Sequence, residues 1–305
     1  MKPVRIKLIV SIAIPAIFIA GVCVWWPSGE IINEEALSFS REKITAENII
    51  PVNYNWSLYY AAIGRYPSQN NSTGSNVVGV IVPHHDLAAD YTAELFQKIG
   101  KRNIQTLIII GPNHENSGAG DIITGLVAYT LPQYQVYSSS TLVAKLLRDK
   151  IAVADTGRLQ TEHSIYNIVP YVNYYFPEAR IVPIILSGRV TLSQAKNLGK
   201  YLASFMDEQT LIIGSIDFSH YLPTEKANAN DLITQGALIS RDYDKIYSFD
   251  NDNVDSPPTT VVVLAATELV GAPELEIVRN ANQAEAMGAS SVPSSTSYFT
   301  ILMRR

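Results

Sequence analysis

Cysteine is almost absent from this sequence, since Cys23 is the only one among 305 residues. A single cysteine excludes an internal disulfide, and its place in the N-terminal segment leaves no thiolate for a catalytic site in the rest of the chain. Histidine is also scarce, with five residues in all. Any reactive or metal-binding site beyond the N-terminal segment therefore has to use a few imidazoles and oxygen groups.

Clusters of basic residues are missing as well. The chain has 23 Lys and Arg residues against 28 Asp and Glu residues, which gives a net charge of −5. We find no Lys- or Arg-rich stripe, and this disfavours binding to the phosphate backbone of nucleic acids. Charged residues make up 17% of the chain and hydrophobic residues 47%, so one large domain can bury a substantial core.

The longest uncharged run is LIVSIAIPAIFIAGVCVWW, residues 8–26, which has the length of a helix that spans a bilayer. The basic segment 1–7 precedes it and is expected to stay in the cytoplasm, while Trp25 and Trp26 suit the outer interface. We therefore predict a single-pass anchor in the cell membrane, with the C-terminal domain outside the cytoplasm. A cleaved signal peptide is the alternative, although no clear small-x-small site follows the run.

The rest of the chain divides into a polar, turn-rich lead-in over residues 27–76, interpreted as a partly ordered tether, and a domain over residues 77–305. The predicted strands are 76–83, 105–111, 179–188, 209–216, 275–281 and 298–303. The predicted helices are 87–101, 141–150, 163–176, 192–206, 225–240 and 260–270. Continuous Val, Ile and Leu runs are typical of strands covered on both faces, so we predict a single α/β domain with three layers, helix–sheet–helix.

The histidines fall at the ends of predicted strands or at the start of a predicted helix. The residues are His84, His85, His114 and His220 near strand ends and His163 at a helix start. Ligands bind beyond the carboxyl ends of the strands in open α/β sheets, so these imidazoles are expected to share one crevice. Neutral imidazoles with a carboxylate suit iron, zinc or another divalent transition metal. The nearby carboxylates are Asp86, Glu115, Glu162, Asp217 and Asp255.

Ordinary structural roles also account for several of these residues. Asp86 can cap the helix predicted from Leu87, Glu162 can interact with the dipole of the next helix, and Asp217 can orient His220. A histidine at one strand end is more often a hydrogen-bonding residue than a ligand. Three strands that each end in a polar cluster with histidine nevertheless favour a shared functional site.

Four motifs resemble those of the Memo family, also called the AmmeMemoRadiSam system protein B family. They are PHH after a strand, GPNH, EHSI with a following PY, and DFSH, in the family's order and approximate spacing. The resemblance covers residues 77–305 and implies the fold of LigB-type class III extradiol dioxygenases. It matches His84 and His114 to the family's metal-site histidines, and Glu162, His163, Asp217 and His220 to motifs that line the same crevice.

The chain departs from the family pattern in two places. The usual Pro-His-Ala-Gly motif is Pro83-His84-His85-Asp86 here, and strand alternation points His85 to the opposite side from His84 unless the chain turns directly after Pro83. Human Memo has a cysteine near the start of a late helix, where Asp255 is the closest match in this chain and Ser256 the alternative. The related dioxygenases use a carboxylate in that role.

The resemblance implies a membrane-anchored enzyme with a divalent transition metal, iron being preferred over copper and zinc. The implied metal ligands are His84, His114 and Asp255, and the implied catalytic residues are His220, Asp217, His163 and Glu162. Fold relatives imply dioxygenase-like oxidoreduction, and metal-assisted hydrolysis needs much the same residues. The alternatives are a non-catalytic module that binds a small molecule or a peptide in the crevice and a purely structural exported domain. Convergence of the ligand residues favours the enzyme, and dispersed residues or a Pro257-Pro258 loop in the pocket favour the binding module.

Overall fold

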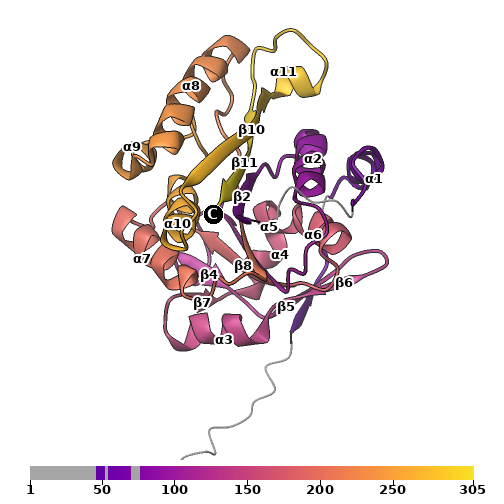
Figure 1. Cartoon of the computed structure of the whole chain (residues 1–305), viewed down its shortest axis with the longest axis vertical. Coiled ribbons are helices and arrows are strands. Elements are labelled where there is room, and N and C mark those ends of the chain that lie inside the picture. The colour runs from indigo at the N-terminus through magenta and orange to yellow at the C-terminus, as the bar shows by residue number, and fades with distance from the viewer. Residues whose placement is uncertain (1–45, 52–53, 70–75) are drawn as a thin grey trace, which may run out of the picture. The chain divides into compact units, whose positions relative to one another are not determined.

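The computed structural model describes residues 46–51, 54–69 and 76–305. All described elements belong to one unit, Ile44–Arg305 (Figure 1). The predicted membrane segment, residues 8–26, and the basic segment before it lie outside the described residues. Among the helices of the described part, none combines the length and the hydrophobicity that crossing a bilayer requires.

An eight-stranded mixed sheet forms the centre of the unit. Its strands, in spatial order, are β10 (Glu274–Asn282), β11 (Ser297–Arg304), β2 (Val77–Val82), β9 (Thr210–Ser215), β3 (Thr106–Pro112), β8 (Arg180–Leu186), β4 (Ile122–Thr124) and β7 (Val153–Ala154). The four strands β2, β9, β3 and β8 are parallel, and antiparallel partners extend the sheet at both sides. The six predicted strands are confirmed, while the short β4 and β7 were not predicted.

A second, three-stranded sheet was also not predicted. It consists of β1 (Glu47–Ile49), β5 (Val127–Thr130) and β6 (Gln135–Tyr137). Because β1 pairs in parallel with β5, part of the lead-in before residue 77 is bound to the α/β unit. The α1 helix (Trp56–Arg65) belongs to the same lead-in and buries Tyr59 and Ala62 in the hydrophobic core.

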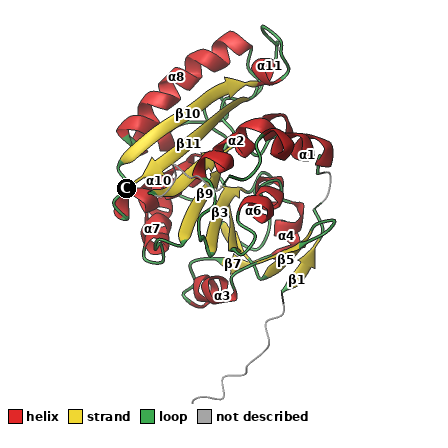
Figure 2. Cartoon of the chain, turned by 45° about the vertical axis from the view of Figure 1, so that its right-hand side comes forward, coloured by secondary structure: helices red, strands yellow, loops and turns green. Residues whose placement is uncertain are grey.

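Helices cover both faces of the large sheet, and Figure 2 shows the strands between them. One face carries α1, α2 (Ala89–Ile99), α4 (Thr156–Thr161), α5 (His163–Tyr166) and α6 (Val169–Tyr175), and the other carries α3 (Ser140–Arg148), α7 (Leu192–Ala203), α8 (Thr224–Ser240), α9 (Tyr243–Tyr247) and α10 (Pro257–Leu269). The short α11 (Gln283–Ala286) follows β10.

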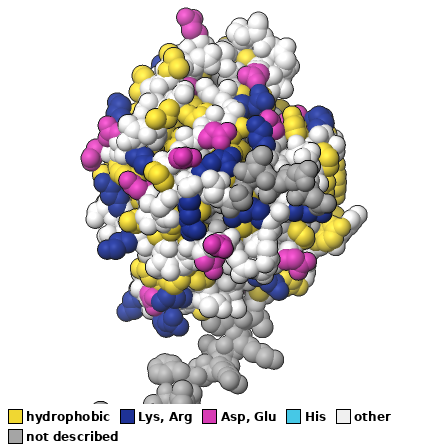
Figure 3. All heavy atoms as spheres, in the orientation of Figure 1, with side chains coloured by type: hydrophobic (Ala, Val, Ile, Leu, Met, Phe, Trp, Pro, Cys, Tyr) yellow, Lys and Arg dark blue, Asp and Glu magenta, His cyan; other side chains and the backbone are white. Residues whose placement is uncertain are grey.

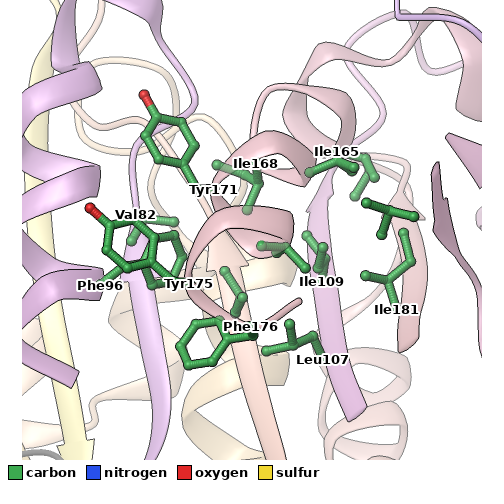
Figure 4. Packing of buried hydrophobic residues seen from close by; sticks show 14 of the residues in the cluster. Val82, Phe96, Leu107, Ile109, Ile165, Ile168, Tyr171, Tyr175, Phe176 and Ile181 are labelled. Carbon is green, nitrogen blue, oxygen red and sulfur yellow. The ribbon is translucent and has the colours of Figure 1, made fainter. Parts of the chain in front are cut away.

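Strand residues alternate between two hydrophobic clusters, one on each face of the sheet. Leu107 and Ile109 belong to the cluster with α2 and α6, seen in Figure 4, whereas Ile108 and Ile110 belong to the cluster with α7 and α10. Alternate side chains of one strand point to opposite faces. All four are fully buried, so the predicted three-layer arrangement is confirmed for the described unit.

The predicted helix 163–176 is divided into two short helices, α5 and α6. Pro170 lies in the first turn of α6, and its ring has no N–H group to continue the hydrogen bonding of α5. A proline at residue 170 of a continuous helix would also clash with the carbonyl group of Tyr166. The break lets His163 begin a separate four-residue helix beside the end of β3.

The strand order brings three polar segments to one edge of the sheet. Val82 at the end of β2 pairs with Ser215 at the end of β9, and β9 lies next to β3, which ends at Pro112. The residues that follow these strand ends therefore lie side by side. They include His84, Asp217 and His114.

Candidate metal centre

Three histidines that are far apart in the sequence converge at this edge. One ring nitrogen each from His84, His114 and His163 lies within 4.8 Å of the others, which is a spacing that can hold a metal ion. The His114 and His163 rings are stacked at 4.2 Å between centroids, and the His84 ring lies 5.1 Å from each. The prediction that strand-end imidazoles share one crevice is therefore met by these three.

His84 is the buried member of the set. Its Nδ1 lies 3.2 Å from Ser215 Oγ, and its Nε2 lies 3.5 Å from Asp217 Oδ2 and 3.4 Å from Asp255 Oδ2. Burial, followed by the neighbouring His114 and His163, lowers the pKa of His84 well below its usual value. The ring is therefore neutral at physiological pH, which is the form that binds metals.

His114 is oriented by a buried carboxylate. Its Nδ1–H donates to Glu162 Oε1 at 2.7 Å and its backbone N–H donates to Glu162 Oε2 at 3.0 Å. Because the proton is on Nδ1, the Nε2 lone pair of His114 is free, and Nε2 lies 3.9 Å from Asp255 Oδ2. A carboxylate behind a histidine in this way fixes the tautomer and orientation of a metal ligand.

Glu162 also begins the α5 helix, as the sequence suggested. Its side chain accepts from the Ser164 N–H at 3.1 Å. Burial would raise the pKa of Glu162, but the interactions with His114, first of all its hydrogen bond, and the hydrogen bond from Ser164 outweigh burial and bring the pKa to about 2. Glu162 is therefore an anion in the folded protein and acts through His114, since it is completely buried.

Arg158 is a site residue that the sequence reasoning missed. Its guanidinium is buried and donates to Glu162 Oε2 at 2.9 Å and to Asn113 Oδ1 at 2.9 Å, and it forms an ion pair with Glu115 at 2.7 Å. The available signal was the four-residue spacing from Arg158 to Glu162, which brings the two side chains together only when the intervening segment is helical. Arg158 balances the charge of the carboxylate that orients His114.

Two buried aspartates complete the donor set. Asp255 precedes Ser256, the N-cap residue of α10. Asp255 Oδ2 accepts from the Asp217 N–H at 3.1 Å, and Asp217 Oδ1 accepts from the His84 N–H at 3.1 Å. Burial raises the pKa of both carboxyl groups, and the charge of Asp217 adds to the shift at Asp255. By hydrogen-bond geometry, Asp255 Oδ1 is buried and finds no partner within the part of the chain that the structure describes, which fits a group that faces a cation. The Ser256 hydroxyl instead donates to Thr259 at the start of α10.

His220 lines the same cavity, but Asp217 does not orient it in the expected way. Both oxygens of Asp217 face His84, and among the described residues Nδ1 of His220 has no hydrogen-bond partner. Burial lowers the pKa of His220, although the charge of Asp217 counteracts this. The imidazole is therefore neutral and able to accept a proton.

His85 lies in the same cavity as His84, because the chain turns immediately after the strand. His85 Nδ1 accepts from the Leu87 N–H at 3.2 Å and caps the short 3-10 helix η2 (Asp86–Ala88). The sequence suggested Asp86 for this role. Asp86 instead accepts a weak hydrogen bond from Asn167 at 3.5 Å.

A cavity of about 500 Å³ joins these groups. Its polar lining residues include four histidines of the strand ends and α5, together with His220, Asp217 and Asp255. Its lining also includes Tyr221, Tyr247, Phe249, Pro257 and Pro258. The two prolines form the first turn of α10 and do not fill the cavity. The arrangement can hold a divalent cation and still admit a small molecule.

Comparison with known proteins gives one family. The family model described as Memo-like protein matches residues 60–301. A MEMO1 family protein of Pyrobaculum arsenaticum is 27% identical over 262 residues, which are 82% of this chain and 92% of the relative. A MEMO1 family protein of Methanothermobacter thermautotrophicus is 28% identical over 225 residues, which are 70% of this chain and 80% of the relative.

Among solved structures, the chain is similar to the uncharacterized protein JW3007 from Escherichia coli K12. The TM-score is 0.49 at 10% sequence identity, and the match covers 74% of this chain and 99% of the other.

Proposed function

This chain belongs to the Memo family, and from the geometry of its site we propose that it is a metal-dependent oxidoreductase with His84, His114 and Asp255 as ligands. The observation that carries the proposal is the convergence of imidazole nitrogens and a buried carboxylate on one cavity. Two histidines and one carboxylate with open positions are typical of non-haem iron oxygenases. Iron is therefore the proposed metal, with copper and zinc as alternatives.

A bound iron would supply activation of dioxygen and of a substrate oxygen. The protein residues would do the remaining work. Glu162 holds His114 in the tautomer with a free Nε2, and Asp217 holds the backbone of His84. His220 accepts or donates the substrate proton, since its neutral ring lies in the same cavity. Tyr247 and Phe249 add aromatic ring surface to the lining of the same cavity.

The position of His163 favours metal-assisted hydrolysis as a second candidate. Its ring nitrogen lies with those of His84 and His114 within 4.8 Å, so a three-histidine site is also available. Three histidines and an open position are used by zinc enzymes that activate water. The two candidates differ in the third ligand, which is Asp255 for the oxidoreductase and His163 for the hydrolase.

Metal analysis of the purified full-length chain and its variants tests the proposal. We expect about one equivalent of iron after anaerobic loading, with binding lost in His84→Ala, His114→Ala and Asp255→Ala and retained in His220→Ala. Loss of binding in His163→Ala and retention in Asp255→Ala would instead establish the three-histidine site. No stoichiometric metal in the wild-type chain, or unchanged metal content in the double variant His84→Ala and His114→Ala, would refute both.

We also propose that residues 8–26 anchor the chain in the cell membrane, with the α/β unit outside the cytoplasm. Support comes from the sequence alone, through the uncharged run and the basic residues before it. The proposed ligand is a small molecule or peptide and not a nucleic acid, because basic and acidic side chains are interspersed on the face shown in Figure 3. Protease accessibility of the α/β unit in intact cells, compared with disrupted cells, tests the orientation.

A further inference from the structure

His85 is the residue at which this chain departs from the family motif, and its hydrogen bonding fixes where its proton lies. A backbone N–H can only donate, so the bond from Leu87 N–H to His85 Nδ1 requires an unprotonated Nδ1. In a neutral imidazole the proton is then on Nε2. The capping of η2 therefore makes His85 Nε2–H a hydrogen-bond donor with a defined position.

The surroundings of His85 leave this donor available. The His85 ring packs beside the buried ring of Tyr298, at 5.7 Å between centroids. His85 lines the large cavity together with His84 and His114, and no acceptor for its Nε2–H occurs among the described residues. Capping and packing thus hold an unpaired donor at the wall of the proposed active site.

The lining of the cavity also includes apolar groups. Tyr221, Phe249, Pro257 and Pro258 contribute ring surface to it. The hydroxyl group of Tyr247 donates to the backbone carbonyl of Val190 at 3.1 Å, so it is already used. A molecule in this cavity therefore meets apolar rings as well as hydrogen-bond donors and the proposed metal ligands.

We infer that His85 determines substrate specificity by donating a hydrogen bond from Nε2–H to an oxygen acceptor, most simply a carboxylate, on a small molecule with an apolar body. The inference rests on the proposed function, because it assigns a substrate contact in the same pocket. His85 has this role in addition to its capping role. A residue that only capped η2 would contribute equally to binding of all ligands.

Two substitutions separate the capping role from the donor role. In His85→Asn, the side-chain oxygen can still accept from the Leu87 N–H, because asparagine makes this contact two residues along the chain, but no donor reaches the position of Nε2. In His85→Gln, the longer amide can place an N–H group near that position while the cap is weakened. Tyr243→Phe is the matched control, since the Tyr243 hydroxyl group donates to Glu268 and the residue does not line the cavity.

The experiment measures binding of cyclohexanecarboxylate to the metal-loaded full-length chain by isothermal titration calorimetry, with cyclohexanemethylamine as the probe that lacks an oxygen acceptor. We expect the carboxylate to bind and the amine not to bind. Affinity for the carboxylate falls about tenfold or more in His85→Asn, recovers in part in His85→Gln and stays at the wild-type level in Tyr243→Phe.

Equal affinity of the wild-type chain and His85→Asn for the carboxylate would overturn the inference. It would also be overturned if the wild-type chain bound the amine with the same affinity as the carboxylate, or if it bound neither probe. Metal content, measured on the same samples, keeps the two ideas apart. Suppose that neither the wild-type chain nor any variant holds metal, but carboxylate binding still depends on His85. The proposed function then fails and the inference stands. If all hold metal and the His85 variants bind alike, only the inference fails.

Discussion

Replacing Glu162 with glutamine tests whether the buried carboxylate controls the metal-binding form of His114. Both oxygens of Glu162 accept hydrogen bonds. The donors are the Nδ1–H and backbone N–H of His114, the Ser164 N–H and the Arg158 guanidinium. A glutamine amide has one oxygen, so its NH₂ group must face one of these donors. Where it faces His114 Nδ1, the proton of the ring moves to Nε2, the nitrogen that is proposed to bind metal.

The expected effects of Glu162→Gln follow from burial and from the contact behind the ligand. Loss of a contact of this kind weakens metal affinity by about 10- to 100-fold. The buried Arg158 also loses one of its two anionic partners, which costs about 3 kcal/mol of folding free energy, at the low end for a broken buried ion pair because Glu115 still pairs with it.

Equilibrium dialysis against a metal-buffered solution measures the affinity, and urea unfolding without metal measures the stability. Glu115→Gln is the matched control, because Glu115 pairs with the same Arg158 but is 65% exposed and makes no contact with His114. We expect near-normal metal affinity in that control. Metal affinity in Glu162→Gln equal to that in Glu115→Gln would refute the argument that Glu162 sets the tautomer of His114.

Three other substitutions probe packing and burial. Gly199→Ala in α7 places a methyl group 2.8 Å from the Val262 carbonyl oxygen of α10 and is expected to lower the free energy of unfolding by about 1–3 kcal/mol in urea titrations. The added methyl group of Gly236→Ala in α8 meets nothing within 4 Å, so this substitution is expected to raise the free energy of unfolding by about 1 kcal/mol. A Gly199→Ala variant more stable than Gly236→Ala would contradict this description of the packing. Burial raises the pKa of Asp231 in the folded state, so the wild-type chain loses stability relative to Asp231→Asn as the pH rises from below 3.8 through the raised pKa. Parallel stability curves from pH 3 to 7 would show that the Asp231 carboxyl group does not titrate abnormally.

Continuous apolar runs made the large parallel strands predictable, since each strand buries both faces. The short strands β4 and β7 have only two or three residues, too few for a pattern, and they form because β8 offers an edge to β4. The break between α5 and α6 had a visible signal in Pro170. The helical periodicity on both sides of that proline outweighed it in the prediction.

The site was partly predictable for a similar reason. His84 follows β2 and His114 follows β3, which are separated in the sheet only by β9, so strand order brings the two residues to the same edge. The contacts of Asp217 depend on the direction of the chain after β9, where it turns towards the His84 backbone and away from His220. The proximity of His163 to both other rings depends on where α5 begins, which the sequence does not specify to within one residue.

The burial of α10 has a kinetic consequence for the proposed metal centre. Ten consecutive residues of this helix, 258–267, are buried between the sheet and α7, so Asp255 at its start is attached to an element that opens only when much of the unit unfolds. The side chains of His114 and His163 are 32% and 42% exposed. An ion leaving the centre is therefore expected to be released first by these two imidazoles, with Asp255 and His84 as the last contacts, and its exchange rate is set by motion on the α5 side.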